Sequence, residues 1–174
     1  KPSDKAEAEA KAEAKRNEVP AGSHDAKVIW MHEKLERPEM LIGSTYKIKT
    51  PVSDHAMYVT INDIVLNEGT EHEQRRPFEI FINSKNLDHF QWIVALTRII
   101  SAVFRKGGDV NFLVEELKAV FDPRGGQWME GRYVPSLLAA IGGVIERHLI
   151  EIGFLSPADA PLLLFVANDY ARKG

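Results

Sequence analysis

Two His-Glu pairs, His32-Glu33 and His72-Glu73, are the residues that come nearest to a metal-binding motif. The helix motif of zinc proteases needs a second histidine four residues after the first, so that both imidazoles face one metal ion. Those positions hold Glu36 and Arg76. The spacing fails, and the six histidines show no other ligand spacing. We therefore assign no metal-binding residue and no catalytic residue.

Two glycine-containing loops have residue types that suit a phosphate. Gly107-Gly108 comes just before an expected helix start at Asp109, and Arg124-Gly125-Gly126 comes after that helix. Backbone N–H groups at a helix N-terminus bind anions, and Arg124 would add a charge-assisted contact. Neither loop matches the phosphate-loop or dinucleotide pattern. The simpler interpretation is that these glycines cap and turn the chain, with Gly107 in the left-handed conformation that ends the preceding helix.

Arg98 and Arg105 lie seven residues apart on an otherwise apolar helix, in line with small Ala95 and Ala102. Solvent or internal carboxylates are the simplest partners for this stripe, and a partner surface or an anionic ligand is the alternative. Together with the loops, the stripe gives a set of candidate nucleotide-binding residues: Arg98, Arg105, Gly107, Gly108, Arg124, Gly125 and Gly126.

Three segments rich in β-branched and aromatic residues predict strands. They are Tyr46 to Lys49, Met57 to Leu66 and Phe78 to Asn83, and an antiparallel meander is the expected arrangement. Pro77 is expected at a strand end, where the missing N–H does least harm. The period-two pattern places Phe78, Ile80 and Ile82 on one face of the sheet.

After the strands the apolar period changes to three and four. Helices are expected over Asp88 to Lys106, from Asp109 to before Pro123, from Pro135 to Gly153, and from Ser156 onward. Apolar residues wrap most of the first helix, which is therefore expected to be buried at the centre. Gly142-Gly143 in the third helix predicts close packing against another helix. Strands first and helices afterwards indicate an α+β fold, with about four helices around a buried central helix.

Composition bounds the function. The chain has 174 residues and a net charge of −3, so no overall basic field exists to hold nucleic acid or an anionic membrane. No apolar run reaches the roughly 20 residues that span a bilayer, and the N-terminus lacks a signal-peptide core. A cytoplasmic protein is expected, and the first residue, Lys1, suggests a fragment.

Residues 1–26 are rich in Ala, Glu and Lys and are expected to form a flexible tether to a single domain over 27–174.

These 174 residues contain no cysteine. A thiol nucleophile, a disulfide framework, a thiolate zinc site and an iron–sulfur cluster are therefore all excluded within them. Many cytosolic domains contain no cysteine, so this absence has little meaning until the chain is placed in a family.

The segment PFEIFINSKNLDHFQWIVALTRIISAVFRKGGDVNFLVEELKAVFDPRGG resembles the TSCPD-type domain of adenosylcobalamin-dependent (class II) ribonucleotide reductases. The resemblance is closest to the separately encoded small subunit of the split form. ERPEMLIGSTYKIKTP, YVTINDIVLNEGTEHEQRRPFE and PSLLAAIGGVIERHLIEIGF resemble that subunit as well. The similarity covers about Val28 to Phe154.

This resemblance implies an accessory, non-redox part of a class II ribonucleoside-diphosphate reductase, which makes deoxyribonucleotides for DNA synthesis. The expected partner is the large catalytic subunit, which would carry the adenosylcobalamin, and no cofactor is expected on this chain. The family's small subunit usually continues into a cysteine-rich segment that delivers reducing equivalents, and these residues contain no such segment. The alternative is a free-standing nucleotide-sensing or interaction module without catalysis.

Overall fold

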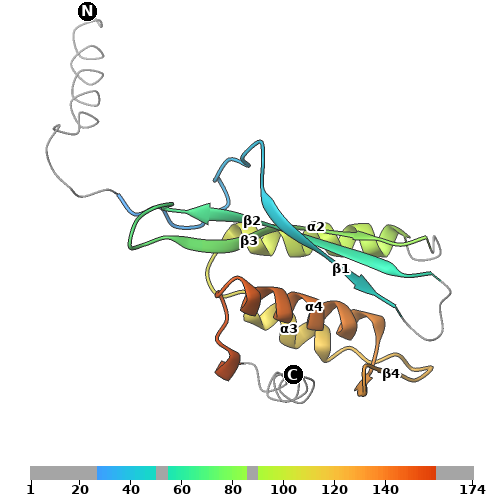
Figure 1. The fold of residues 1–174 in the computed structure, drawn as a ribbon. Helices are drawn as coiled ribbons and strands as arrows, with labels where there is room; N and C mark the ends of the chain where they lie inside the picture. The colour runs from blue at the N-terminus through green and yellow to red at the C-terminus, as the bar shows by residue number, and fades with distance from the viewer. Residues whose placement is uncertain (1–26, 50–54, 86–89, 160–174) are drawn as a thin grey trace, which may run out of the picture.

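The structure, a computed structural model, describes residues 27–49, 55–85 and 90–159. Strands β1 (Ile42–Ile48), β2 (Met57–Leu66) and β3 (Gln74–Asn83) form an antiparallel sheet in that order (Figure 1). Helices α2 (Phe90–Lys106), α3 (Asn111–Lys118) and α4 (Leu137–Glu151) follow, with a hairpin of β4 (Gln127–Met129) and β5 (Arg132–Val134) between α3 and α4. The predicted α+β class and β-meander are confirmed.

Several boundaries differ from the predicted ones. The first strand begins at Ile42 and the third at Gln74, four residues before each predicted start, and the β4–β5 hairpin was not predicted. The predicted fourth helix, from Ser156 onward, lies mostly outside the described residues, which show a short 3-10 turn at Pro157–Asp159. Residues 1–26, predicted to be a tether, lie outside the described residues. No helix in the described ranges is long and apolar enough to cross a membrane.

A break in the β2–β3 register places Pro77 inside a strand. Asn62 pairs with Glu79, whereas its neighbour Asp63 pairs with Pro77, so Phe78 is the extra residue of a bulge. The prediction that Pro77 ends a strand was wrong, because a bulge also accommodates a residue without an N–H. The bulge separates Phe78 from Ile80: Phe78 packs in a small cluster with Met31, Ile64 and Leu66.

The main core lies between one face of the sheet and the helices. Cross-strand neighbours Val59, Ile61 and Ile80 contribute fully buried side chains from the sheet. The helices contribute buried apolar residues that belong to the same cluster: Ile100 and Phe104 from α2, Val114 and Leu117 from α3, and Ile141, Ile145 and Leu149 from α4. Helix α4, paired with α3, therefore lies against one face of the sheet, whereas α2 runs along the free edge of β3, where Ser101 Oγ accepts the Ile80 N–H at 3.0 Å.

Helix α2 is not the buried centre of the domain, and this prediction was wrong. Only Ile100 and Phe104 are buried among its residues, whereas Trp92 and Ile99 are 78% and 60% exposed. The helix packs mainly against β3, while α4 lies against β1 and β2 and pairs with α3. Within the described residues, the outer side of α2 therefore has no neighbouring element, although its sequence is apolar nearly all the way round.

The predicted close packing at the glycine pair is confirmed for one of the two residues. A Cβ on Gly142 would lie 3.0 Å from Cβ of Leu117 on α3, whereas a Cβ on Gly143 would meet no atom within 4 Å. The helix itself begins with a side-chain cap, in which Ser136 Oγ accepts the Ala139 N–H at 3.0 Å. Gly142 thus sets how closely α3 and α4 approach each other.

This asymmetry gives a matched test of the packing. Gly143→Ala should raise the free energy of unfolding by about 0.5–1 kcal/mol, because alanine is the better helix former and its methyl group meets nothing. Gly142→Ala should lower it, since the Leu117 Cβ is fixed to the backbone of α3 and the helices would have to separate. Urea unfolding of both variants measures the difference. Equal effects would contradict the close approach of α3 to α4.

Candidate functional site

A carboxylate is buried in the core at the centre of the molecule. Asp63 follows Val59 and Ile61 on the helix-facing side of β2, and its side chain is 0% exposed. Its Oδ1 lies 2.7 Å from Nε2 of His148 on α4. Its Oδ2 accepts hydrogen bonds from Arg75 on β3, at 2.9 Å from Nε and 2.7 Å from Nη2. A buried charge needs such partners, so this carboxylate fixes β2, β3 and α4 to one another.

His148 extends the contact from the second strand to the first. Its side chain is 1% exposed, and Nδ1 lies 2.8 Å from the hydroxyl of Tyr46 on β1. The two rings meet edge to face, with centroids 5.7 Å apart. The Tyr46 hydroxyl also donates to Glu151 at 2.8 Å, and Glu151 accepts from Arg147 at 2.8 Å. We call Tyr46, Asp63, Arg75, His148 and Glu151 the polar network.

Electrostatics keep the tyrosine neutral and the glutamate charged. Burial, and then the hydrogen bond to Glu151, raise the pKa of Tyr46 above its ordinary value. Burial alone would raise the pKa of Glu151, but the hydrogen bonds from Arg147 and Tyr46 outweigh it and lower that pKa. A phenol with a raised pKa is a poor nucleophile, so Tyr46 is suited to donating a hydrogen bond.

Each polar atom at the centre of the network has a partner. Tyr46 donates to Glu151, and the ring nitrogens of His148 lie 2.8 Å from the Tyr46 hydroxyl and 2.7 Å from the Asp63 carboxylate. The network is thus arranged to hold charge in place, and its groups are directed at one another.

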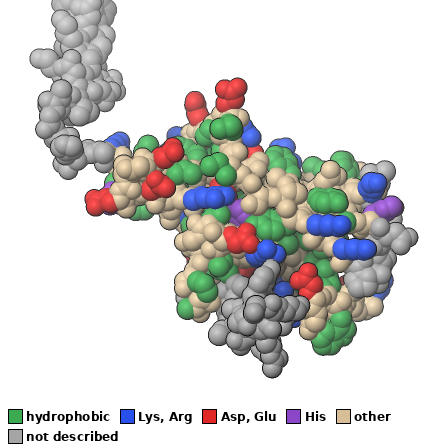
Figure 2. Space-filling view, in the orientation of Figure 1, with side chains coloured by type: hydrophobic (Ala, Val, Ile, Leu, Met, Phe, Trp, Pro, Cys, Tyr) green, Lys and Arg blue, Asp and Glu red, His purple; other side chains and the backbone are tan. Residues whose placement is uncertain are grey.

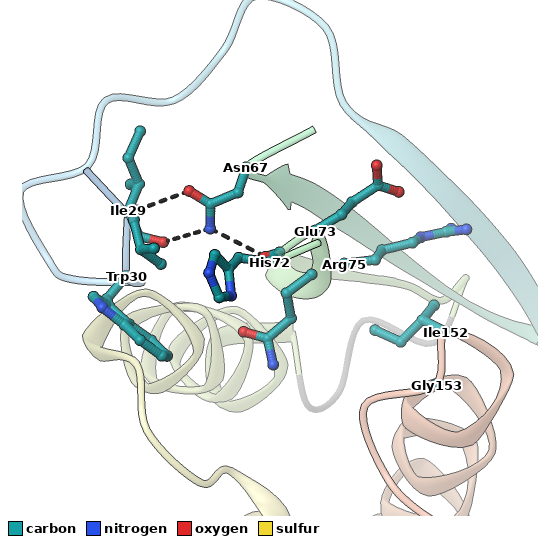
Figure 3. Close-up of a pocket in the computed structure, with 10 residues that line it drawn as sticks. Ile29, Trp30, Asn67, His72, Glu73, Arg75, Ile152 and Gly153 are labelled. Atoms are coloured by element: carbon teal, nitrogen blue, oxygen red, sulfur yellow. Dashed lines mark hydrogen bonds between the residues drawn. The ribbon is translucent and has the colours of Figure 1, made fainter. Parts of the chain in front are cut away.

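A pocket of about 360 Å³ lies beside the network (Figure 3). Asn67 holds one wall together: its side chain accepts the Ile29 N–H at 2.8 Å and donates to the Ile29 and His72 carbonyl oxygens. Figure 3 shows the Arg75 side chain extending away from Trp30 and Asn67, in keeping with its bonds to Asp63. Trp30 and His72, which also line the pocket, are exposed. No cluster of potential metal ligands occurs in the described part of the chain.

The structure does not bring the two predicted glycine loops together. Gly107 and Gly108 come before α3 and Arg124, Gly125 and Gly126 come after it, so the loops lie at opposite ends of that helix. The predicted left-handed conformation of Gly107 is confirmed by its φ of 84°, and a Cβ there would lie 2.4 Å from the Met31 carbonyl oxygen. This glycine is needed for packing whether or not a ligand binds.

Three of the glycine N–H groups expected to hold a phosphate already have partners. Gly107 donates to Phe104 O, Gly125 donates to Asp122 O at 2.9 Å, and Gly126 donates to the Tyr133 hydroxyl at 2.9 Å. The Arg124 N–H and guanidinium both bind Asp122, and these bonds lower the pKa of Asp122. A phosphate would have to displace these bonds. Nucleotide binding at the loops therefore stays a prediction.

Arg98 and Arg105 lie on the exposed side of α2. Arg105 donates to the Ser101 carbonyl at 3.3 Å, and its charge helps to lower the pKa of Glu79, although the main cause there is the hydrogen bond from Arg37. Arg98 is exposed and makes no ion pair within the described residues. These arginines thus face outward, away from the core side of their helix.

The polar network was missed from the sequence, although a signal for it was present. By the period of two, Asp63 falls on the same face as Val59 and Ile61, and His148 falls on the apolar stripe of its helix, three residues after Ile145. A lone polar residue on a core face needs a partner. One acid in a strand and one histidine in a helix, each on a core face, would have indicated the pair.

The chain matches one known protein family over most of its length. A profile of the TSCPD domain matches residues 30–149, which include Tyr46, Asp63, Arg75 and His148. No curated protein and no solved structure matches the chain. The matched region runs from before β1 into the last turn of α4 and covers α2 and all of the polar network except Glu151.

The buried pair predicts a measurable coupling. His148→Ala should lower the free energy of unfolding by about 3 kcal/mol, because it removes one partner of a buried charge. Asp63→Asn should also destabilise the protein, and the two changes together should cost less than their sum by at least about 1 kcal/mol. Urea unfolding of the wild-type chain, both single variants and the double variant gives the four free energies of this double-mutant cycle. Additive effects would mean that the two side chains do not interact energetically.

Proposed function

The chain belongs to the TSCPD domain family, and from this we propose that it is an accessory, non-redox part of a class II ribonucleoside-diphosphate reductase. TSCPD domains occur in ribonucleotide reductase-related proteins. In this proposal the chain docks on the large catalytic subunit in the cytoplasm. The large subunit binds adenosylcobalamin and substrate and performs the radical chemistry, and this chain contributes no residue to the cofactor site.

The family match over residues 30–149 is the observation that carries the proposal. The chemistry of the chain agrees with an accessory role, because these 174 residues contain no cysteine and so no thiol to relay electrons. The most strongly buried ionisable groups, Asp63 and His148, pair with each other and with Arg75 and Tyr46. They stabilise the domain rather than present a reactive group to a substrate.

A rigid scaffold suits this role. The polar network connects β1, β2, β3 and α4, so the sheet and the helical layer are held in one arrangement. Binding surfaces on such pre-organised elements lose less conformational entropy on association. The proposed function thus assigns the interior to stability and the surface to binding.

Titration of the chain into the large subunit of a cobalamin-dependent reductase from the same source tests the proposal. We expect a stoichiometric complex with a Kd tighter than about 10 µM, the range for an interface of ordinary size. Isothermal titration calorimetry gives the affinity, and size-exclusion chromatography with light scattering gives the stoichiometry. The absence of binding at tens of micromolar would contradict the accessory role.

A nucleotide titration separates this proposal from the nucleotide-sensing alternative. If the chain is an accessory module, saturating nucleoside di- and triphosphates should leave its Tm unchanged, because the N–H groups of Gly107, Gly125 and Gly126 are already bonded. Binding of a nucleotide at 100 times its Kd would stabilise the chain by about 2.7 kcal/mol, which a thermal melt detects easily. A clear rise in Tm, together with failure to bind the large subunit, would favour the alternative.

A further inference from the structure

Helix α2 carries an apolar stripe that no other part of the described structure covers. Trp92 and Ile99 are 78% and 60% exposed, and small exposed residues, Ala95 and Ala102, lie between and beyond them. Exposed large apolar side chains that gather on one helix face indicate a binding surface. Figure 2 shows that hydrophobic side chains also reach the surface elsewhere, where they are interspersed with charged groups. The α2 stripe differs because its members repeat at a fixed spacing.

The spacing of the stripe is that of a helix-pairing seam. Trp92, Ala95, Ile99 and Ala102 follow one another at intervals of three, four and three residues. In the heptad notation of coiled coils (positions a to g), these residues occupy positions a and d, through which one helix packs along another. The two large residues are two turns apart, about 10 Å along the axis, and Ala95 between them and Ala102 beyond them let a partner helix approach closely. The stripe therefore fits a helix better than it fits a small molecule.

The border of the stripe is basic. Arg98 and Arg105 lie beside it, seven residues apart, and Lys106 lies at its C-terminal end. Helix α2 contains no acidic residue, although the whole chain has a net charge of −3. The charge of Arg105 helps to lower the pKa of Glu79, but Glu79 is already bound by Arg37 at 2.8 Å, and that hydrogen bond is the main cause of the lowering. The charge on this border is thus left for a partner.

A second copy of the chain fits this surface poorly. In an antiparallel pair of α2 helices, Arg98 and Arg105 would face the same residues of the other copy, and like charges at these flanking positions repel. In a parallel pair the arginines would lie against Leu96 and Val103, which offer no charge. A helix with acidic residues beside its apolar ridge satisfies both the spacing and the charge.

The geometry points to α2 as the docking surface for an amphipathic helix of another polypeptide, whose apolar ridge is bordered by Glu or Asp. Trp92 and Ile99 insert between the apolar residues of that helix, and Arg98 and Arg105 pair with its carboxylates. We identify the polypeptide as the large reductase subunit, and in this respect the inference deepens the proposed function and rests on it.

A designed peptide probes the surface without the large subunit. The probe is a 21-residue helix with Leu at a and d and Glu at e and g, and its matched control has Lys at e and g. Fluorescence anisotropy of the labelled peptides should show at least about tenfold tighter binding of the Glu peptide to the full chain. Arg98→Glu with Arg105→Glu should reverse the preference, so that the Lys peptide binds more tightly.

Two variants distinguish specific binding at the α2 stripe from nonspecific hydrophobic binding. Trp92→Ser should weaken binding of the Glu peptide at least about tenfold, because it removes the larger anchor. Trp128→Ser is the matched control, since Trp128 on β4 is also 70% exposed, and it should leave binding unchanged. Equal binding of the two peptides, or equal effects of the two serine variants, would overturn the inference. So would a dimer of the chain alone that Ile99→Asp dissociates, because the occupant would then be a second copy.

The same variants in the large-subunit titration distinguish the two proposals. If the wild-type chain binds and the Arg98→Glu, Arg105→Glu variant binds at least about tenfold more weakly, the accessory function and the α2 docking surface are both supported. If the wild-type chain and the variant bind equally, the accessory function is supported but the docking surface lies elsewhere. If the wild-type chain does not bind, the accessory function and the identification of the partner fail, and the peptide result alone decides whether α2 is a helix-docking surface. Circular dichroism of each variant checks that it is folded.

Discussion

The buried contact between Asp63 and His148 is the interaction on which the arrangement of the domain depends. A carboxylate without exposure is costly unless it is paired, so the core can close only with His148 on one side and Arg75 on the other. The bulge beside Asp63 shifts the register by one residue and places Arg75 on the neighbouring strand within reach. Tyr46 then connects His148 to the first strand. One polar pair thus sets the position of α4 over β1 and β2, and Arg75 joins β3 to the same carboxylate.

The sequence was sufficient for the classes of element and for most of the core. Period-two alternation located β2 over its full length, and the three- and four-residue period located α2, α3 and α4, because these patterns depend on local geometry alone. It was not sufficient for Pro77, since a bulge depends on the partner strand. The prediction that α2 is buried at the centre also failed, because the period shows which residues are apolar but does not show which of them a second element covers.

In the candidate site, too, features that depend on local sequence were predicted and features that depend on distant residues were not. Gly107 was correctly placed at a helix end in the left-handed conformation, because that conformation follows from local sequence. The partners of the loop N–H groups, such as the Tyr133 hydroxyl on Gly126, come from a hairpin that the sequence did not reveal. Asp63 and His148 are 85 residues apart in the chain, so only the fold brings them together. A polar residue on a core face of each element was the signal that the sequence offered.

These findings describe a domain whose interior is closed around its own charges and whose binding capacity lies on its surface, above all on α2. Hydrogen–deuterium exchange of the chain with and without the large reductase subunit tests this claim most directly. The account predicts slowed exchange in peptides that cover Phe90–Lys106, with no change in the β4–β5 hairpin. Protection of the hairpin or of the Trp30 pocket in place of α2, or no protection at all at a saturating concentration of the large subunit, would contradict it.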